Sequence, residues 1–339
     1  MPHHLRTSPA FIDSKIRKTL PLLYRWYHRH QRPLPWRRNP TPYRVTVSEF
    51  MAQQTRMSTV IPYYLRWIRH FPNWNSLAKA PRRVVLRHWE GLGYYRRARF
   101  LHELARSVVR RSDRRLPSDP KALRALPGIG DYTAGAIASI AFAISEPAFD
   151  GNVARVLGRL SARHGRVANW NSLRAMAGRI VQKKDPGTHN QALMELGALI
   201  CLPKNPLCTQ CPLRKACPSA GKKVSTSKSR PKIVQMKESI LLIRKGPSVW
   251  LTRRHPLNRW QGLWLLPTLV ETGQTKRPVD RISYPYTRYQ VTAEVFAHSQ
   301  PPAGSPGRWF DRRALNQIPL PAPHRQIVNT LGKGSKTRP

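Results

Sequence analysis

The chain has 339 residues, 40% of them hydrophobic, which is enough for two domains with their own cores. Sixty Lys and Arg residues against 16 acidic ones give a formal net charge of +44, which predicts a polyanionic partner, nucleic acid first. A generally basic proteome is the alternative explanation of this charge. No apolar run reaches the length of a membrane span, and residues 1–20 lack the apolar core of a secretion signal, so a membrane or secreted protein is not expected. A basic leader that targets the chain to an organelle is a weaker alternative for this segment.

Residues 15–217 carry the pattern of a helical domain. Apolar residues recur at helical spacing, for instance over residues 60–71, 97–109 and 152–160. Pro, Gly, Asn and Asp residues break the pattern between short segments, as in residues 111–120. We therefore expect a compact, all-α N-terminal domain.

A smaller domain of mixed structure is predicted after a linker. Residues 218–237 are rich in Ser and Lys and poor in apolar residues, which is typical of a linker. Residues 238–254 predict two strands around a Lys-Gly-Pro turn, and residues 288–297 alternate like another strand. Residues 324–331 predict a closing helix. The second domain is therefore expected to be an α+β domain over residues 238–331.

All four cysteines lie within seventeen residues, with the spacing C-x6-C-x2-C-x5-C: Cys201, Cys208, Cys211 and Cys217. Disulfides are not expected in an unsecreted chain without other cysteines. Zinc sites of four cysteines usually pair two short knuckles across a longer loop. Here one segment supplies all four thiols, which favours a [4Fe–4S] cluster over zinc without excluding zinc.

The stretch LPGIG at residues 126–130 is a short glycine loop. No strand pattern precedes it, so the dinucleotide-binding motif, which follows a strand, is not favoured. The loop fits a tight turn between helices, in which Gly128 and Gly130 let the backbone N–H groups approach a DNA phosphate. An ordinary helix–helix turn remains the simpler alternative.

Two carboxylates stand among apolar neighbours. Glu49 lies between Val47 and Phe50, and Asp150 directly precedes an apolar helical pattern. Asp150 fits a helix N-cap, and Glu49 fits a helix residue that faces solvent. As a pair they also fit the cleavage of a glycosidic bond, in which a buried Glu with a raised pKa donates a proton and a better solvated Asp stays charged.

Taken together, these motifs resemble the helix–hairpin–helix DNA glycosylases of the endonuclease III superfamily. Six stretches narrow the resemblance to the adenine DNA glycosylases, the MutY family. They occur in the order of the family's motifs: LPWR (34–37), VSEFMAQQT (47–55), WEGLGYYRRAR (89–99), GIGDYTAGAI (128–137), FDGNVARVL (149–157) and NQALMELGALIC (190–201).

The resemblance implies roles for catalytic residues. Glu49 would be the general acid that protonates the flipped adenine and then helps to activate water, and Asp150 would stabilise the developing sugar cation. Tyr132 and Asn152 would support them. Bifunctional relatives carry a lysine in the slot of Tyr132, and a phenol cannot form a Schiff base but can hydrogen-bond beside Asp150. The resemblance therefore implies removal of the base by water, without efficient strand cleavage.

The resemblance also implies DNA-binding and cofactor residues. Arg37 would line the adenine pocket, and Gln54 and Tyr94 would enter the base stack on either side of the lesion. Thr55 is expected to contact DNA beside Gln54. The four cysteines would hold the [4Fe–4S] cluster, and the two loop glycines would hold the DNA backbone.

The C-terminal domain resembles the family's Nudix-like domain, with GLWLLP at residues 262–267 in place of a similar family stretch. The Glu-rich helix of Nudix hydrolases is missing, so nucleotide hydrolysis is not expected. Where the family reads 8-oxoguanine with Phe-Ser-His, this chain has Tyr286, Thr287 and Arg288. The replacement of His leaves the strictness of lesion recognition open.

We therefore expect an enzyme of base excision repair: a monofunctional adenine DNA glycosylase that hydrolyses the N-glycosidic bond of adenine opposite 8-oxoguanine or guanine. Its expected partner is double-stranded DNA with such a mispair. It is expected to be a cytoplasmic bacterial monomer, nucleoid-associated when bound to DNA. The alternatives are an endonuclease III-like glycosylase and lyase, and a non-catalytic iron–sulfur protein that binds DNA.

Overall fold

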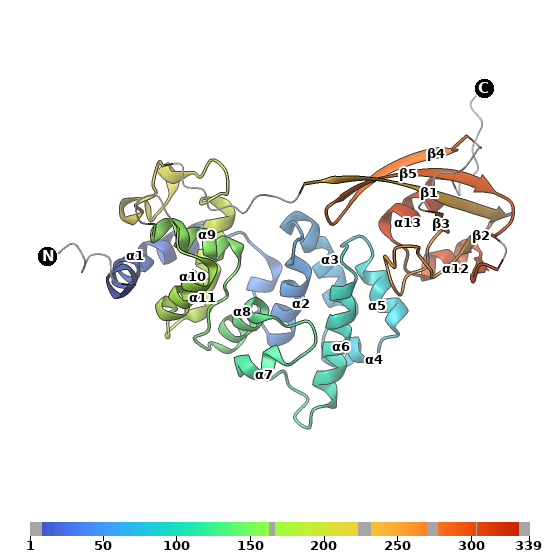
Figure 1. Cartoon of the computed structure of the whole chain (residues 1–339). Coiled ribbons are helices and arrows are strands. Elements are labelled where there is room, and N and C mark those ends of the chain that lie inside the picture. Colours follow the sequence, from blue (N-terminus) through green and yellow to red (C-terminus); the bar gives the residue numbers. More distant parts are fainter. Residues whose placement is uncertain (1–8, 163–166, 223–231, 270–276, 303, 332–339) are drawn as a thin grey trace. The chain divides into compact units, whose positions relative to one another are not determined.

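The computed structural model describes residues 9–162, 167–222, 232–269, 277–302 and 304–331 (Figure 1). The chain forms two compact units. Residues 1–75 and 103–229 make up the first, and residues 76–102 and 230–339 make up the second. The segment 76–102, predicted to belong to the helical domain, thus groups with the C-terminal part of the chain.

The described part of the first unit is helical, as predicted. Two short 3-10 turns, η3 (Cys208–Gln210) and η4 (Arg214–Ala216), shape the cysteine loop, and a third, η2 (Pro35–Arg37), precedes α2. Two helices, α4 (Trp74–Lys79) and α6 (Arg96–Arg110), run across the boundaries between the units. The remaining helices are α1 (Pro9–His30), α2 (Pro42–Ala52), α3 (Met57–His70), α7 (Pro120–Arg124), α8 (Asp131–Phe142), α9 (Gly151–Leu160), α10 (Trp170–Ile180) and α11 (Pro186–Leu199).

Local signals set the ends of the helices that carry the site. At the start of α2, the Thr41 side chain accepts a hydrogen bond from the backbone N–H of Arg44, and Pro42 occupies the first turn, where it has no intrahelical N–H to lose. The helix α8 begins after Gly130 and ends at Ala143, which has a left-handed φ of 55°. Asp150 is the N-cap of α9 and accepts a hydrogen bond from the N–H of Val153.

The helices α1, α9, α10 and α11 share one buried apolar core. The apolar residues of α9 recur every three or four positions, so they form one face, which is buried. The cysteine loop joins this core through Leu213, which is 1% exposed. The cysteine loop is therefore anchored to the core that contains α9, whose N-cap is Asp150, and α11, which ends just before Cys201.

Two glycines permit close approach of the chain segments on either side of Asp150 to neighbouring helices. A Cβ atom at Gly135 would lie 2.1 Å from the carbonyl oxygen of Pro147, and one at Gly197 would lie 2.6 Å from the Cβ of Asn152. Only glycine, which has no Cβ atom, leaves room for these contacts. It lets α8 pack against the segment before Asp150, and α11 against α9.

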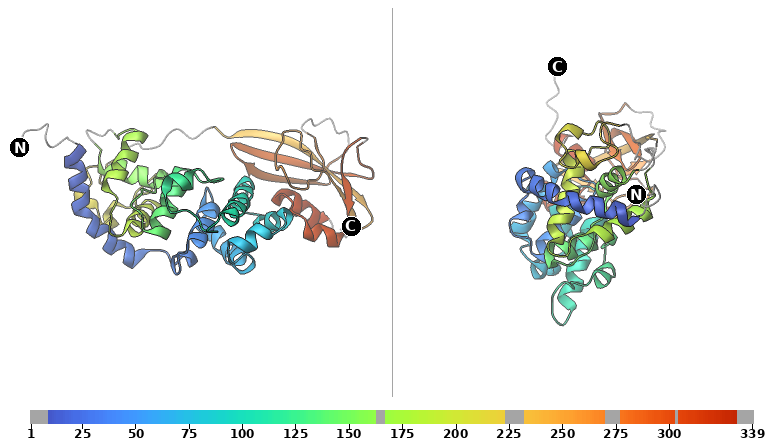
Figure 2. Two further views of the ribbon diagram at one scale, coloured as in Figure 1. Left: turned by 90° about the horizontal axis from the view of Figure 1, so that it is seen from below. Right: turned by 90° about the vertical axis from the view of Figure 1, so that its left-hand side faces the viewer.

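The second unit contains a sheet with the strand order β4-β5-β1-β2-β6, in which β3 also pairs with β1 (Figures 1 and 2). β1 and β5 are parallel, and the other pairs are antiparallel. The turn between β1 and β2 contains Gly246, whose φ is 56°. The strands are β1 (Val234–Lys245), β2 (Ser248–Leu251), β3 (Thr268–Leu269), β4 (Asp280–Tyr286), β5 (Tyr289–His298) and β6 (Arg308–Phe310).

Both faces of the sheet bury apolar residues. In β1, Ile240 and Leu242 belong to a large core, whereas Leu241 and Ile243 belong to a smaller cluster. This alternation is the period of two expected of a strand. Ile327 of α13 (Ala322–Leu331) packs into the larger core, as does part of α12 (Arg312–Gln317). The sheet, the predicted strands and the closing helix confirm the expected α+β domain, although β1 begins before residue 238, and β3, β4, β6 and α12 were not predicted.

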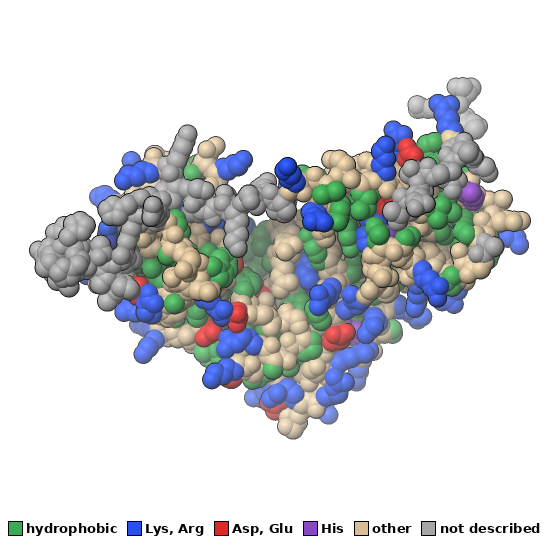
Figure 3. All heavy atoms as spheres, viewed as in Figure 1, with side chains coloured by type: hydrophobic (Ala, Val, Ile, Leu, Met, Phe, Trp, Pro, Cys, Tyr) green, Lys and Arg blue, Asp and Glu red, His purple; other side chains and the backbone are tan. Residues whose placement is uncertain are grey.

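The surface is rich in cations. Figure 3 shows Lys and Arg side chains spread across the viewed face, with few acidic ones between them. No helix among the described residues is both long and apolar enough to cross a membrane.

Candidate active site

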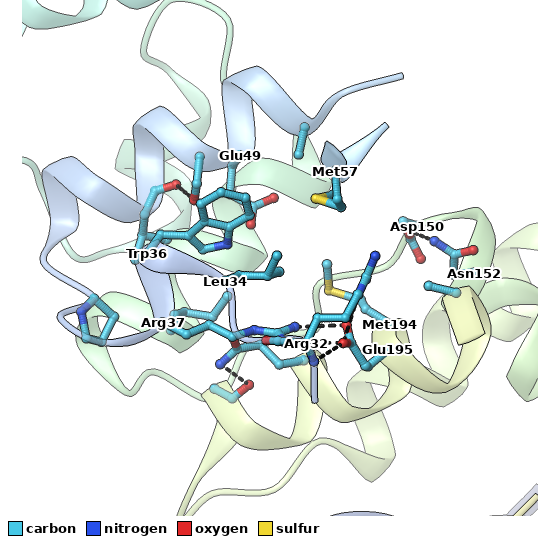
Figure 4. A pocket seen from close by; sticks show the side chains of 18 of the residues that line it. Arg32, Leu34, Trp36, Arg37, Glu49, Met57, Asp150, Asn152, Met194 and Glu195 are labelled. Atoms are coloured by element: carbon cyan, nitrogen blue, oxygen red, sulfur yellow. Dashed lines mark hydrogen bonds and ion pairs between the residues drawn. The ribbon is translucent and has the colours of Figure 1, made fainter. Parts of the chain in front are cut away.

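A cavity of about 940 Å³ lies in the first unit, lined by residues of α2, α8, α11, the start of α9 and the segment around η2. Four of the predicted site residues, Glu49, Tyr132, Asp150 and Asn152, line it together. In Figure 4, the carboxyl groups of Glu49 and Asp150 reach into this cavity from different elements, α2 and the start of α9. The fold thus brings together two acidic residues that are far apart in the sequence.

Glu49 is a buried carboxyl group, with 7% of the residue exposed. It does not face solvent on α2, which was the simpler sequence interpretation. Burial raises its pKa from an ordinary value of 4.5 to about 7, because desolvation outweighs the hydrogen bond from Tyr132. Near neutral pH, Glu49 therefore exchanges a proton readily, as a general acid must.

Tyr132 has a different partner from the predicted one. Its hydroxyl donates a hydrogen bond to Oε2 of Glu49 at 2.7 Å, whereas a hydrogen bond beside Asp150 was expected. The reason is the packing of α8 against α2, which directs Tyr132 of the first turn toward Glu49. Burial and the nearby carboxyl groups of Glu49 and Asp150 raise the pKa of Tyr132 well above its ordinary value, so the phenol stays protonated and remains a donor.

Asp150 is both a helix cap and a residue of the cavity. Its Oδ1 accepts from the N–H of Val153 at 2.8 Å, and its Oδ2 accepts from Nδ2 of Asn152 at 2.8 Å. Burial raises the pKa of Asp150, while these hydrogen bonds and Arg155 lower it. Asp150 is less buried than Glu49, as expected, but hydrogen-bond donors of the protein support its charged form.

A chain of hydrogen bonds connects Asp150 with the cysteine loop. Oδ1 of Asn152 accepts from Nη2 of Arg155 at 2.8 Å, and Nε of Arg155 donates to the carbonyl oxygen of Cys201 at 2.7 Å. Arg159, one turn later on α9, donates to Sγ of Cys201 at 3.3 Å. The position of the cysteine loop therefore bears directly on the position of Asp150.

An ion-pair cluster forms another wall of the cavity. Glu195 is 1% exposed and accepts from Nε and Nη2 of Arg32 at 2.9 and 2.8 Å, and from Nη2 of Arg37 at 2.9 Å. Burial disfavours the charged form of Glu195, but the hydrogen bonds from both arginines outweigh it and lower the pKa to about 2. Arg37 was predicted to line this cavity, but Arg32 and Glu195 were not. Glu195 stands among apolar residues, the same signal that singled out Glu49.

The four cysteine thiols line one small pocket together with Arg159 and Arg214. Among the described residues, no group of three or more His, Cys, Asp or Glu side chains is arranged to hold a metal ion. Burial raises the pKa of Cys211 to about 11 and also raises that of Cys217, so a metal group would have to displace the thiol protons. Four cysteine thiols that line one pocket match the ligand set of a [4Fe–4S] cluster.

Family models match both parts of the chain. Residues 47–178 match the HhH-GPD superfamily base excision DNA repair protein, and residues 239–330 match the NUDIX domain. The adenine DNA glycosylase of Buchnera aphidicola subsp. Schizaphis graminum is 30% identical over 336 residues, which cover 91% of this chain and 96% of the relative. The chain belongs to the adenine DNA glycosylase family. The adenine DNA glycosylase of Buchnera aphidicola subsp. Baizongia pistaciae is 35% identical over 255 residues, which cover 72% of this chain and 72% of the relative.

Human adenine DNA glycosylase is a longer relative of this chain. The two are 44% identical over 207 residues, but this region is only 38% of the human protein. The solved structure of a thermostable thymine-DNA glycosylase is 28% identical, covers 60% of this chain and 96% of its own, and has a TM-score of 0.56. An endonuclease III–DNA complex, 22% identical with a TM-score of 0.52, covers 61% of this chain and 96% of its own and shows the same fold.

The residues predicted to contact DNA lie in both units of this glycosylase-family chain. Gln54 is exposed, and both Gln54 and Thr55 line the cavity. Tyr94 is 49% exposed, between α5 (Arg82–Trp89) and α6. The turn between β4 and β5 consists of Thr287 and Arg288, which are exposed, and follows the half-buried Tyr286. Gln54, Tyr94 and Thr287 have φ values of 54°, 46° and 52°, a costly region for residues other than Gly, which often marks functional positions.

The two loop glycines differ in their backbone conformation. Gly128 has a φ of 76°, which the tight turn before α8 requires. Gly130 has an extended backbone, and a Cβ atom there would meet open space. The fold itself therefore does not require glycine at residue 130, and its surface is open to a ligand.

Proposed function

We propose that this chain removes adenine from double-stranded DNA by hydrolysing its N-glycosidic bond. The supporting observation is the pair of carboxyl groups in one cavity: Glu49, buried with a pKa of about 7, and Asp150, hydrogen-bonded by Asn152 and a backbone N–H. Membership of the adenine DNA glycosylase family supports adenine as this base. An adenine inside the duplex must leave the stack to reach such a cavity.

The proposed chemistry divides two tasks between the carboxyl groups. Glu49 donates its proton to the ring of the flipped adenine, which makes the base a better leaving group. The bond between the sugar and the base then breaks, and the positive charge that develops on the sugar is stabilised by the carboxylate of Asp150. Water adds to the sugar and returns a proton to Glu49. Tyr132 holds Glu49 through its hydroxyl, and Asn152 and Arg155 hold Asp150.

The same cavity argues for base removal without strand cleavage. A lyase needs an amine that attacks the sugar, and none of the described residues that line the cavity is a lysine. Tyr132 stays protonated and donates to Glu49, so it serves as a support rather than as a nucleophile.

The ion-pair cluster is the proposed wall against which the adenine rests. Glu195 holds Arg32 and Arg37 at the cavity, so the guanidinium groups do not have to be ordered when the base enters. Leu34, Trp36 and Met57 add apolar surface for the base. A wall that is fixed before the base arrives lowers the entropic cost of binding.

The base opposite the adenine is proposed to be 8-oxoguanine or guanine. Tyr286, Thr287 and Arg288 offer an aromatic ring, a hydroxyl and a guanidinium group to that base or to its phosphate. Gln54 and Tyr94 are proposed to enter the base stack, with Thr55 as a further DNA contact. The loop of Gly128 and Gly130 presents N–H groups at the start of α8 to the DNA backbone.

The cysteine loop is proposed to hold a [4Fe–4S] cluster through its four thiols. When bound, this group would fix a segment that otherwise has little regular structure. The chain's own contribution is the network around it: Arg159 donates to Sγ of Cys201, and Arg155 donates to the carbonyl oxygen of the same residue. A fixed loop would therefore keep Arg155 and Asn152 in place beside Asp150.

One gel tests the proposed reaction. Duplexes with a labelled strand carry A opposite 8-oxoguanine, A opposite G, or A opposite T, and each is incubated with the protein and divided into samples with and without alkali. Breakage at the adenine of the first two duplexes, only after alkali, is the expected result. Glu49→Gln is the matched control and should give no breakage in any sample. Breakage without alkali would indicate a lyase, and intact strands in both samples would refute glycosylase activity.

A further inference from the structure

The segment 76–102 belongs to the same compact unit as the sheet. It contains α5, the start of α6 and, between them, Tyr94. Tyr94 is the residue proposed to enter the base stack, and the turn at Tyr286 is proposed to contact the opposite base. Both proposed DNA contacts are thus parts of one unit, and whatever holds this unit together also sets their relative position.

A buried ion pair joins the segment to the C-terminal helices. Nε of Arg325, on α13, donates to Oε1 of Glu90 at 2.7 Å, and its Nη2 donates to Oε2 at 3.2 Å. The side chains of Glu90 and Arg325 are only 7% and 12% exposed. This arrangement of two parallel hydrogen bonds constrains direction as well as distance.

Both partners of the pair are held further by backbone groups. The guanidinium group of Arg325 also donates to the carbonyl oxygens of Leu315 at 2.8 Å and Ile318 at 2.7 Å. Oε2 of Glu90 accepts from the backbone N–H of Leu320 at 3.1 Å. The pair is therefore built into the connection between α12 and α13, and is more than a surface contact.

The residue next to Tyr94 makes a second connection. The hydroxyl of Tyr95, which is 8% exposed, donates to the carbonyl oxygen of Leu320 at 3.1 Å. The same short stretch of the C-terminal part thus accepts from Tyr95 and donates to Glu90. Tyr94 lies between these two anchors in the sequence, with the strained φ of 46°.

The other proposed DNA contact, Tyr286, is held by the sheet and by α13. The ring of Trp260 packs edge-on against Tyr286, with ring centres 5.6 Å apart, and against His324 of α13 at 5.0 Å, so Trp260 links Tyr286 to the helix that carries Arg325. The Arg259 guanidinium lies 5.1 Å from the centre of the Tyr286 ring and is itself paired with the buried Glu238. Tyr286 is therefore fixed from the side of the sheet, and Tyr94 from the side of Glu90.

We infer that Glu90 and Arg325 are positioning residues that set the place of Tyr94 relative to Tyr286, and thereby the preference of the enzyme for the base opposite adenine. This inference rests on the proposed function. Neither residue touches the cavity that holds Glu49 and Asp150. Their loss should consequently change the discrimination between opposing bases more than the removal of adenine itself.

The test is a cycle of variants in the full-length protein: Glu90→Gln, Arg325→Lys and both together. Single-turnover rates of adenine release are measured for A opposite 8-oxoguanine and for A opposite G. A displacement of about 1 Å costs on the order of 10²-fold in such geometry-dependent steps, so we expect the ratio of the two rates to fall about tenfold or more in each single variant. Glu90 also pairs with Arg87 at 3.3 Å, and Arg325 also donates to two carbonyl oxygens, so each change removes contacts of its own besides the shared one. The loss in the double variant should therefore be smaller than the product of the two single losses.

An ion pair in the first unit, whose arginine is more exposed than Arg325, serves as the control. Asp13 accepts from Nε of Arg179 at 2.5 Å and joins α1 to α10, and Asp13→Asn should lower stability without changing the ratio. If folded Glu90→Gln protein keeps the wild-type ratio of the two rates, whether or not both rates fall, the inference is overturned.

Hydrogen exchange separates this inference from the proposed function. In Glu90→Gln, the amides of α5 and α13 should exchange faster together, while those of α9 and α11 should keep their protection. If the wild-type protein released no adenine, the proposed function would fall. The exchange pattern would still decide whether Glu90 couples the two segments, and unchanged protection of α5 would refute that coupling.

Discussion

Replacing Glu49 by Gln should inactivate the protein and at the same time stabilise it. Burial raises the pKa of Glu49 from 4.5 to about 7, so ionised Glu49 destabilises the folded state relative to the unfolded state. This difference in pKa corresponds to about 3 kcal/mol of unfolding free energy. Gln keeps the shape of the side chain and a carbonyl oxygen for the Tyr132 hydroxyl, but carries no charge at any pH.

The gain in stability should depend on pH with a definite sign. A carboxyl group with a raised folded pKa contributes no penalty below its unfolded pKa, and the penalty grows as the pH rises from 4.5 to about 7 and then levels off. The variant should therefore exceed the wild type by only about 1 kcal/mol at pH 5, but by about 3 kcal/mol at pH 8. For a unit of this size, the latter value corresponds to a rise in Tm of roughly 6–12 °C.

The assay is thermal unfolding of both proteins at pH 5 and pH 8, with adenine release measured on the same samples. Glu146→Gln is the matched control, because Glu146 undergoes the same chemical change but is partly exposed and paired with Arg124 at 3.2 Å. It should gain no stability at pH 8. Equal unfolding temperatures of wild type and Glu49→Gln at pH 8 would show that burial does not raise the pKa of Glu49. Turnover near the wild-type rate would remove Glu49 from the chemistry.

Four further predictions concern catalysis, DNA binding and the cofactor. The single-turnover rate should fall about tenfold per pH unit above about pH 7, because Glu49 must be protonated; a rate that rises from neutral to alkaline pH would contradict its role as the acid. Arg155→Lys should slow base release by on the order of tenfold or more with little change in DNA affinity, since it frees Asn152 and the carbonyl oxygen of Cys201; equal losses in rate and affinity would point to general unfolding. If the protein neutralises about 6–10 phosphates, raising the salt concentration from roughly 50 to 200 mM should lower the DNA affinity by on the order of 10³–10⁵. Asp131→Asn removes a negative charge beside the glycine loop and should raise the DNA affinity. An affinity that does not change with salt would show that the net charge does not contribute to DNA binding. Protein purified without oxygen should be yellow-brown and contain iron, and zinc without iron would disprove the cluster.

The sequence alone determined the features that depend on local order. The spacing of the cysteines, the glycine loop between α7 and α8 and the apolar periodicity of α9 are all set by residues close in the chain. These signals were sufficient for the helical domain, the strands β1, β2 and β5, and the closing helix. The motifs also indicated the adenine DNA glycosylase family, which the comparison with relatives shows.

Only the tertiary structure decided what depends on distant residues and on burial. It placed Glu49 opposite Asp150 and turned the Tyr132 hydroxyl toward Glu49, because these contacts follow from the packing of α2, α8 and α9. It also brought Arg32 to Glu195, across more than half of the helical sequence. A pKa near 7 for Glu49 arises from desolvation, which a sequence pattern can favour but cannot establish. The pairing of Glu90 with Arg325 is of the same kind, since no local pattern relates a residue of the α5 segment to one in the last helix.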